Sequence, residues 1–440
     1  MPMTGGHTFV GFGLGPIQGG LFLQEALRSG GFRRLVVAEV QPETVNSVRR
    51  SGGMFSVNIA HSDRREVAEV GPVEIFNPSS VEDRYALVEA VSNAEEIATA
   101  VPSVHNYETI GRGSIHRILA EGLRKKAHHC LPRAVIYAAE NHNHAAEILQ
   151  SRVFTVIPPE EQQAVQSRVR FLNTVIGKMS VVISDPQEVR EQGLTAITAS
   201  ETRAFLVEAF NRILISHICF EEGPFCRGIS VFEEKPDLLP FAEAKLYGHN
   251  ATHALAAYVG AMHGVQRIAD LSSLPGMISF LEAAFIHESG EALIRRHAGI
   301  DPLFTEEGYR EYALDLIQRM TNPYLSDRVE RLGRDPGRKL GWDDRLVGTV
   351  RIALRHGVMP RRYAFGVAAA LAALDRSGLE SDAPVSTFLD PLWKDASPDK
   401  RERETVLKLI EEGRALLRRW RSASFPDLEA LFLNRVTGEK

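Results

Sequence analysis

Lys245, Asn250 and His253 follow one another at spacings of five and three within a run that reads as helix. At about 100° per residue, Lys245 and His253 lie within roughly 80° of each other on such a helix, and Asn250 lies about 140° from Lys245. One broad face can therefore present an amine, an amide and an imidazole to a common pocket. Together these groups can take a proton from an alcohol and hold the resulting oxyanion. A solvated helix face with an incidental histidine is the alternative.

A glycine-rich turn near the N-terminus can supply a nucleotide cofactor for that chemistry. An apolar stretch at residues 8–12 runs into Gly13-Leu-Gly-Pro-Ile17, and a helical run and a second apolar strand at residues 34–40 follow. Glycines there let the backbone approach a pyrophosphate, whose charge meets the free N–H groups of the helix start. Glu39 ends the second strand, where a carboxylate suits a ribose diol and repels a 2′-phosphate, so NAD is favoured over NADP. Gln18 replaces the third glycine of this fingerprint, and a plain glycine-rich turn is the alternative.

A second polar cluster, Glu140-Asn-His-Asn-His144, follows the apolar strand at residues 134–138. Ligands of open parallel sheets bind beyond the carboxyl ends of strands, so Asn141 is well placed to contact one. Capping of the next helix by Asn141 or Asn143 is the alternative. Metal binding by the histidines is disfavoured, because adjacent side chains at a helix start do not converge on one ion.

The order of strand and helix signals predicts two domains. Strand signals dominate up to about residue 190, and helical periodicity then takes over, beginning with residues 201–215. The prediction is an α/β, Rossmann-type dinucleotide-binding domain at residues 1–195, followed by a mostly α-helical C-terminal domain at residues 196–440. Residues 219–237 are expected to form an inserted hairpin or loop.

Composition narrows the class of protein. The 440 residues carry a net charge of −5, which argues against nucleic acid or an anionic membrane as the main partner. No apolar run approaches the roughly 18 residues that would span a bilayer, and the N-terminus lacks the pattern of a signal peptide. Three cysteines suggest neither a disulfide framework nor a zinc site. We expect a cytoplasmic protein.

With these residues in view, the chain resembles the long-chain mannitol dehydrogenase family of polyol-specific dehydrogenases, and most closely its members that act on mannitol 1-phosphate. The resemblance runs over nearly the whole chain. It rests on the glycine turn with Glu39, the strand end at Asn141, the Lys245-x4-Asn250-x2-His253 signature and the basic stretch at residues 322–340. The signature is its most specific part.

The resemblance implies a metal-independent, NAD-linked dehydrogenase of secondary alcohols. Lys245 would be the general base, Asn141 and Asn250 would hydrogen-bond the developing alkoxide, and His253 would hold the reacting oxygen or a neighbouring hydroxyl. A lysine with a pKa near about 10.4 is a poor base at neutral pH, so the site must lower that pKa. Arg331 and Lys339 are the expected sources of the positive field.

The remaining site residues fall into two groups. Those expected to bind the cofactor are Gly13, Gly15, Pro16, Ile17, Glu39 and Val101. Those expected to bind the substrate, for which a solvated basic face is the alternative, are Arg331, Arg334, Arg338 and Lys339. The partner would be a small sugar alcohol or sugar phosphate, and the protein a monomer or homodimer. The expected reaction interconverts a sugar-alcohol phosphate and a ketose phosphate; the alternatives are a dehydrogenase of an unphosphorylated polyol or hexuronate, and a non-catalytic NAD-binding protein.

Three places depart from the pattern of the phosphate-specific relatives. Gly19 stands where they usually carry an arginine, and Gly177-Lys178 stands where they have an Asp-Arg pair. Inside the signature, Gly248 and His249 replace apolar or hydroxyl residues. The first departure bears on cofactor contacts, and the other two bear on the substrate pocket.

Overall fold

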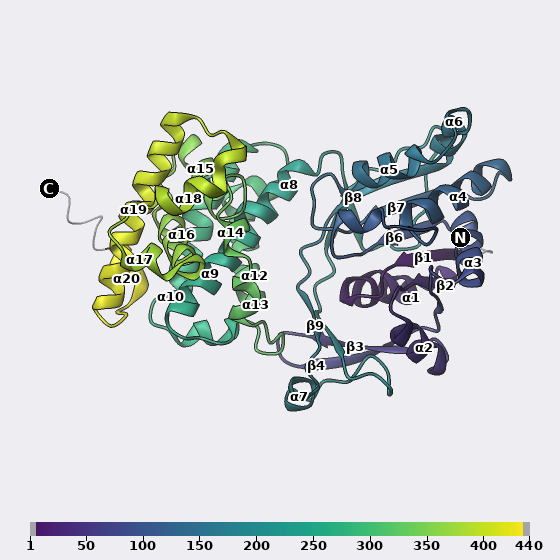
Figure 1. Cartoon of the computed structure of the whole chain (residues 1–440), viewed down its shortest axis with the longest axis horizontal. Helices are drawn as coiled ribbons and strands as arrows, with labels where there is room; N and C mark the ends of the chain where they lie inside the picture. Colours follow the sequence, from purple (N-terminus) through teal and green to yellow (C-terminus); the bar gives the residue numbers. More distant parts are fainter. Residues whose placement is uncertain (1–5, 434–440) are drawn as a thin grey trace. The chain divides into compact units, whose positions relative to one another are not determined.

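The computed structural model describes residues 6–433, so the ends of both expected domains, including the N-terminal segment judged for a signal peptide, lie outside the described residues. The chain divides into two compact units between Leu239 and Pro240. The first unit holds the sheets, and the second is built of helices (Figure 1). This confirms the predicted fold class, a Rossmann-type domain followed by a mostly helical one.

The main sheet of the first unit has eight strands in the order β12-β11-β8-β7-β6-β1-β2-β5. The six neighbouring strands β5, β2, β1, β6, β7 and β8 are mutually parallel. Strand β11 runs antiparallel to β8, and β12 runs parallel to β11. Because the chain crosses from β5 at the edge back to β6 beside β1, a crevice opens at the carboxyl ends of β1 and β6, where nucleotides bind in such sheets. The bounds are β1 His7–Phe12, β2 Phe32–Ala38, β5 Glu74–Phe76, β6 Glu96–Thr99, β7 Ala134–Ala138, β8 Val169–Val175, β11 Ile213–Ser216 and β12 Phe232–Lys235.

Both faces of this sheet are buried, because successive side chains of a strand point to opposite faces. Val10 packs among apolar residues of the helices α3 (Val81–Asn93), α4 (Ile115–His128) and α5 (Ala145–Thr155). Phe9 packs on the other side, against the helix that follows the glycine turn and a second sheet. That sheet has the order β4-β3-β10-β9, with bounds β3 Phe55–Ala60, β4 Arg65–Val70, β9 Ser180–Ile183 and β10 Ala204–Glu208. The remaining helices of the unit are η1 Gln18–Leu23, α1 Gln24–Ser29, α2 Pro42–Arg50, η2 Val104–Tyr107, α6 Pro159–Arg168 and α7 Pro186–Glu191.

The observed boundary differs from the expected one at residue 195, and the helix expected at residues 201–215 is wrong. That stretch forms β10 and β11, and the predicted insert at residues 219–237 contributes β12. Strands β10–β12 pair with β3, β8 and one another, so they belong to the first unit. The apolar runs of these strands are too short for their periodicity to distinguish a strand from a buried helix turn.

The second unit is built around α16, Arg361–Leu374, which packs against α9 (Asn250–Met262) and α19 (Lys400–Ser422). Glycine allows the close approach on both sides. A Cβ at Gly366 would lie 2.3 Å from Leu255 Cδ1 on α9, and a Cβ at Gly413 on α19 would lie 2.7 Å from the backbone of Ala364. This packing fixes α9, which carries Asn250 and His253. The other helices discussed below are α8 Leu239–Glu243, η3 Ala244–His249, η5 Ala284–Gly290, α12 Glu306–Met320, α13 Val329–Gly333, α14 Pro336–Lys339 and α15 Val347–Arg355. Among residues 6–433, no helix has the length and apolar character needed to cross a membrane.

Candidate active site

The helix that carries the signature contains a π turn. Residues 239–262 run continuously through α8, the π segment η3 and α9. Within it, the Asn250 N–H donates to the carbonyl of Lys245, which is an i→i+5 bond. Lys245 and Asn250 therefore stand one turn apart on nearly the same face. The 140° separation expected from an ideal α-helix is wrong, and the error favours the proposed chemistry.

Glycine at position 248 belongs to this π turn because two aromatic side chains crowd it. A Cβ at Gly248 would lie 2.6 Å from the Phe285 ring and 2.6 Å from the Tyr309 hydroxyl. Phe285 lies in η5, a second π segment, and Tyr309 lies in α12. The departure at Gly248 is thus a packing requirement of the helix that presents Lys245.

Lys245 is half-buried, and its pKa is lowered to about 8. Burial is the main cause, and the positive charge of Arg345 is the second. Arg345 precedes α15, and its Nε donates to Asp344 Oδ1 at 2.8 Å. The field was expected from Arg331 and Lys339, so the sequence reasoning missed Arg345. Its position in a connection between two helices gives no periodic signal.

His249 adds no charge beside Lys245. Its side chain is buried, and burial together with the nearby His253, Arg319 and Lys245 holds its pKa well below the usual value. The rings of His249 and His253 lie 6.0 Å apart. A neutral imidazole at position 249 avoids repelling the cations around it.

His253 contacts a buried carboxylate that the sequence reasoning did not assign. Its Nε2 lies 3.3 Å from Oδ2 of Asp327. Asp327 also accepts hydrogen bonds from Arg331, which is thereby connected to His253. The structure thus brings Arg331 and His253 together, as the predicted site requires.

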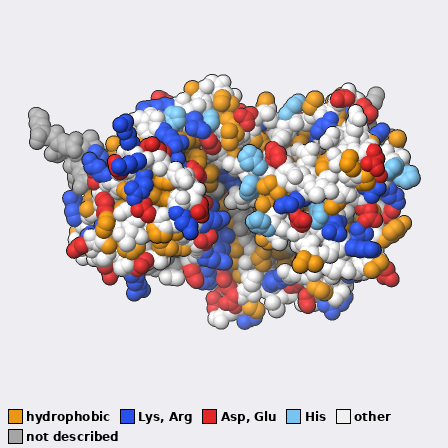
Figure 2. Space-filling view, turned by 45° about the horizontal axis from the view of Figure 1, so that its top comes forward, with side chains coloured by type: hydrophobic (Ala, Val, Ile, Leu, Met, Phe, Trp, Pro, Cys, Tyr) orange, Lys and Arg blue, Asp and Glu red, His pale blue; other side chains and the backbone are white. Residues whose placement is uncertain are grey.

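The other basic residues of the stretch 331–339 differ in exposure. Lys339 is buried with its Nζ 5.9 Å from the centre of the Tyr258 ring on α9, and it donates to the Arg334 carbonyl. Burial and the charges of Arg345 and Arg338 lower the Lys339 pKa to about 8. Arg334 and Arg338 are exposed, and Arg338 pairs with Asp335 at 3.2 Å. The helical unit displays Lys and Arg side chains interspersed with Asp and Glu over its surface (Figure 2).

In the first unit, the glycine turn and Glu39 lie at the carboxyl edge of the main sheet. Gly13 has a φ of 85°, and a Cβ there would lie 3.0 Å from the Ala100 carbonyl and 3.1 Å from Val101. Gly15 faces open space, and the helix begins directly afterwards at Pro16 and Ile17. These are features of a pyrophosphate cradle: a backbone that a ligand can approach, next to a helix start, where the first N–H groups lack partners within the helix.

Glu39 fastens this turn to the end of β2. One carboxylate oxygen accepts from Leu14 N and the other from Gln41 N, each at 2.8 Å. A carboxylate has about four lone-pair sites, so each oxygen keeps capacity for a ribose hydroxyl.

The departures near the turn also have packing causes. Gln18 is fully buried against β1, and a Cβ at Gly11 would lie 2.3 Å from its Nε2. The close contact between helix and strand is therefore permitted by Gly11 on the strand, not by a glycine at position 18. A Cβ at Gly19 would lie 2.9 Å from the Phe55 ring of the second sheet. Position 19 therefore has no room for the arginine of the relatives.

Asn141 lies just past the carboxyl end of β7, next to a buried acid. Glu140 accepts hydrogen bonds from Val101 N and from the hydroxyls of Thr99 and Tyr107, and burial raises its pKa to about 7. The contacts Glu39–Leu14, Gly13–Val101 and Val101–Glu140 thus connect the cofactor-binding set to Asn141 along one sheet edge. Among the residues that the structure describes, no three His, Cys, Asp or Glu side chains are grouped to hold a metal ion.

Lys178 is buried rather than directed at a ligand. Its Nζ donates to the carbonyls of Glu208 and Phe210 and to Asn211 Oδ1. It anchors the end of β10, so the second departure reflects local structure.

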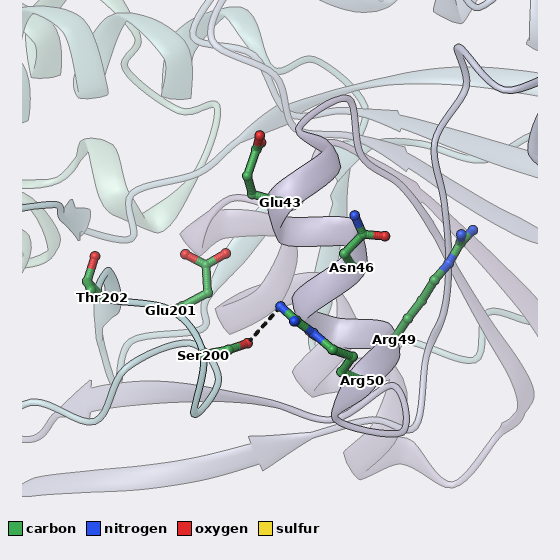
Figure 3. A pocket seen from close by; sticks show the side chains of 7 residues that line it. All are labelled: Glu43, Asn46, Arg49, Arg50, Ser200, Glu201 and Thr202. Carbon is green, nitrogen blue, oxygen red and sulfur yellow. Dashed lines mark hydrogen bonds between the residues drawn. The ribbon is translucent and has the colours of Figure 1, made fainter.

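A pocket of about 610 Å³ lies elsewhere in the first unit, between α2 and residues 200–202 (Figure 3). Its two cations already have partners: Arg49 pairs with Asp83, and Arg50 donates to Ser200 at 3.4 Å. It contains none of the residues predicted for the active site.

Comparison with known proteins places both units in one family. The Mannitol dehydrogenase Rossmann domain matches residues 7–223, and the Mannitol dehydrogenase C-terminal domain matches residues 237–414. The chain is 33% identical over 364 residues to a mannitol-1-phosphate 5-dehydrogenase of Bacillus pumilus (strain SAFR-032), which covers 82% of this chain and 86% of the relative. The corresponding enzyme of Bacillus licheniformis is 30% identical over the same shares.

Solved structures show the same fold. A D-sorbitol dehydrogenase in substrate-free form has a TM-score of 0.72 at 15% identity, covering 96% of this chain and 94% of its own. The Pseudomonas fluorescens mannitol 2-dehydrogenase in ternary complex with NAD and D-mannitol has a TM-score of 0.70 at 13% identity, covering 99% and 95%. The protein is therefore an oxidoreductase of CH–OH groups with a dinucleotide-binding Rossmann domain. It belongs to the mannitol dehydrogenase family and is a polyol dehydrogenase.

The charge of Arg345 generates a pH prediction. Lys245, the predicted general base, must be neutral to accept a proton, so kcat/KM for alcohol oxidation should rise with pH through about 8, the Lys245 pKa. Arg345→Met removes a neighbouring positive charge, which should raise that pKa and move the rise to higher pH. Arg345→Lys keeps the charge and should leave the midpoint close to the wild-type value. A pH–rate profile of the three proteins checks this, and an unmoved midpoint in Arg345→Met contradicts the role of Arg345.

Proposed function

We propose that this protein is an NAD-dependent oxidoreductase that interconverts a sugar-alcohol phosphate and a ketose phosphate, of the mannitol 1-phosphate and fructose 6-phosphate type. The observation that carries the proposal is the alignment of Lys245 and Asn250 on one face by the π turn, within a cluster of cations. The two mannitol-1-phosphate 5-dehydrogenases at 33% and 30% identity support the phosphate class.

Each residue of the signature has a role in removing hydrogen from a secondary alcohol. The neutral Lys245 amine takes the hydroxyl proton, and this needs no metal ion. Asn250 donates a hydrogen bond to the oxygen as negative charge develops on it, and removal of such a donor typically costs about 2.7–4 kcal/mol of activation free energy. Asn141 is proposed as a further donor, and His253 holds the reacting oxygen or a neighbouring hydroxyl. In the reverse direction the Lys245 ammonium returns the proton to the carbonyl oxygen.

The geometry of the first unit supports NAD as the cofactor. The backbone of Gly13 and Gly15 and the helix start at Pro16 and Ile17 would hold the pyrophosphate, with Val101 beside the turn. The Glu39 carboxylate would accept from the ribose hydroxyls and would repel a 2′-phosphate. Bound NAD supplies the hydride acceptor of the reaction.

Cations at the substrate end favour a phosphate. Arg331 presents a planar guanidinium, which matches phosphate oxygens in pairs, and Lys339 presents a point charge. Lys339 contacts Tyr258 of α9, and Arg331 contacts Asp327, the partner of His253 on α9. Arg334 and Arg338 are exposed and would add a longer-range attraction. We assign the direct phosphate contacts to Arg331 and Lys339.

An unphosphorylated polyol or a hexuronate is the second candidate substrate. It is favoured by the burial of Lys178 among backbone carbonyls, which leaves this chain without the Asp-Arg pair of the phosphate-specific relatives. The two structural neighbours, a D-sorbitol dehydrogenase and a mannitol 2-dehydrogenase with bound D-mannitol, support it as well. The cytoplasmic location and the monomeric or dimeric state stay predictions.

Substrate preference distinguishes the two candidates. NADH consumption with fructose 6-phosphate, fructose and a hexuronate should show the highest kcat/KM for fructose 6-phosphate, by at least about 100-fold, since two charge-assisted contacts are worth about 3 kcal/mol or more together. Lys339→Met should lower kcat/KM for fructose 6-phosphate far more than for fructose. The exposed Lys400 supplies the control, Lys400→Met, which should match the wild type. Turnover of fructose or a hexuronate alone would defeat the phosphate assignment.

Removal of the Lys245 amine tests the mechanism. Lys245→Ala should lower kcat by about 10³-fold or more, because general acid–base catalysis contributes about 10²–10⁴-fold. NAD affinity, measured by calorimetry, should stay within about twofold of the wild type, since the cofactor contacts belong to the first unit. Lys408→Ala, at an exposed position of α19, controls for the loss of a surface lysine. Retained turnover in Lys245→Ala would exclude it as the base.

A further inference from the structure

Asp327 is a buried carboxylate in the second unit that has no role in the mechanism described so far. Only 3% of the residue is exposed, and it lies two residues before α13. Its backbone carbonyl accepts from Ile268 N at 2.9 Å, which fixes the chain at this point. An acid so far from water requires partners for its charge.

One partner is His253, from the catalytic signature. Its Nε2 and Asp327 Oδ2 lie 3.3 Å apart, and neither atom has another hydrogen-bond partner. The pair does not have the geometry of a well-formed hydrogen bond, yet the two atoms face each other in a buried place. Facing a carboxylate, Nε2 must carry the ring proton, so Nδ1 of a neutral His253 is left as an acceptor.

The other partner is Arg331, from the basic stretch. Both its Nε and its Nη2 donate to Asp327 Oδ1. The guanidinium is thereby fixed along one edge, and Nη1 remains to donate to a ligand. Burial alone would raise the Asp327 pKa, but the contacts with His253 and Arg331 outweigh it and hold the pKa below its usual value.

We propose that Asp327 is a positioning residue that holds His253 in the Nε2–H tautomer and fixes Arg331 beside it. The two oxygens of one carboxylate thus place a hydrogen-bond acceptor, His253 Nδ1, next to a cationic donor, Arg331. That pair suits a ligand that carries both a hydroxyl group and an anionic oxygen, which is the chemistry of a polyol phosphate. The assignment of the substrate rests on the proposed function, whereas the control of the tautomer by Asp327 does not.

The tautomer can be measured without substrate. In protein labelled with ¹⁵N-histidine, long-range ¹H–¹⁵N spectra report which ring nitrogen carries the proton, and the spectrum of His253→Gln identifies the His253 signals by their loss. The wild type should show protonated Nε2 and unprotonated Nδ1. Asp327→Asn can turn a donor toward the ring and should shift His253 to the Nδ1–H form or a mixture.

Kinetics supply the second readout. With fructose 6-phosphate and NADH, Asp327→Asn should lower kcat/KM by about 100-fold, because an imidazole in the wrong tautomer is catalytically impaired even where its position is kept. Asp270→Asn is the matched control: Asp270 binds an arginine, Arg267, but its side chain is 40% exposed and its carboxylate lies against Arg267 rather than a signature residue. It should leave both the tautomer and kcat/KM unchanged.

The outcomes separate the alternatives. A wild-type tautomer in Asp327→Asn overturns the proposal, whether activity is kept or lost, because a loss without a tautomer change reflects a structural role. Circular dichroism and thermal melting verify that Asp327→Asn is folded. If it is not, Asp327→Glu replaces it and should keep the wild-type tautomer of His253 with a higher KM. A changed tautomer in Asp327→Glu, despite the retained charge, overturns the proposal. If the wild-type protein were inactive on every polyol and ketose, the proposed function would be wrong. The role of Asp327 would then be tested by the His253 tautomer measurement alone.

Discussion

The hydrogen bond from Asn250 N–H to the Lys245 carbonyl sets the relative placement of the two residues that we propose to act on the substrate oxygen. In an α-helix, residues five apart point in clearly different directions, whereas an i→i+5 bond stacks them one turn apart. The π turn is held by packing: Gly248 has no side chain because Phe285 and the Tyr309 hydroxyl occupy that space. The relative placement of Lys245 and Asn250 is therefore tied to the packing of η3 against η5 and α12.

Around that turn, burial and charge act in the same direction on Lys245. Removing an ammonium from water disfavours its charged form, and Arg345 disfavours it further, so the amine is available near neutral pH. His249 stays neutral for the same reasons. Asp327 is the buried negative charge within this group of cations. Because its carboxylate faces both His253 and Arg331, it reduces the repulsion between the positive charges. The unit thus gathers cations around the signature, and Asp327 places a carboxylate against both His253 and Arg331.

The sequence predicted what local patterns determine. The turn at Gly13, the acid at Glu39 and the strand before Asn141 follow one another closely in the chain, and the Rossmann-type unit and its family resemblance follow from them. What it could not predict depends on distant partners. Gly248 in the π turn packs on Phe285 and Tyr309, Arg345 lies near Lys245, and β10 and β11 pair with β3 and β8. None of these distant contacts leaves a periodic trace in the residues affected. The roles of the signature residues stay predictions, and the helix on which they lie departs from the ideal α-helix that the sequence reasoning assumed.

The most direct measurement of the central claim is a crystal structure of the ternary complex with NAD and mannitol 1-phosphate. The account predicts that the oxygen to be oxidised lies within hydrogen-bond distance of both Lys245 Nζ and Asn250 Nδ2, with the π turn intact and the phosphate on Arg331 and Lys339. A substrate oxygen bound away from Lys245, or an α-helical turn in which Lys245 and Asn250 diverge, would contradict it.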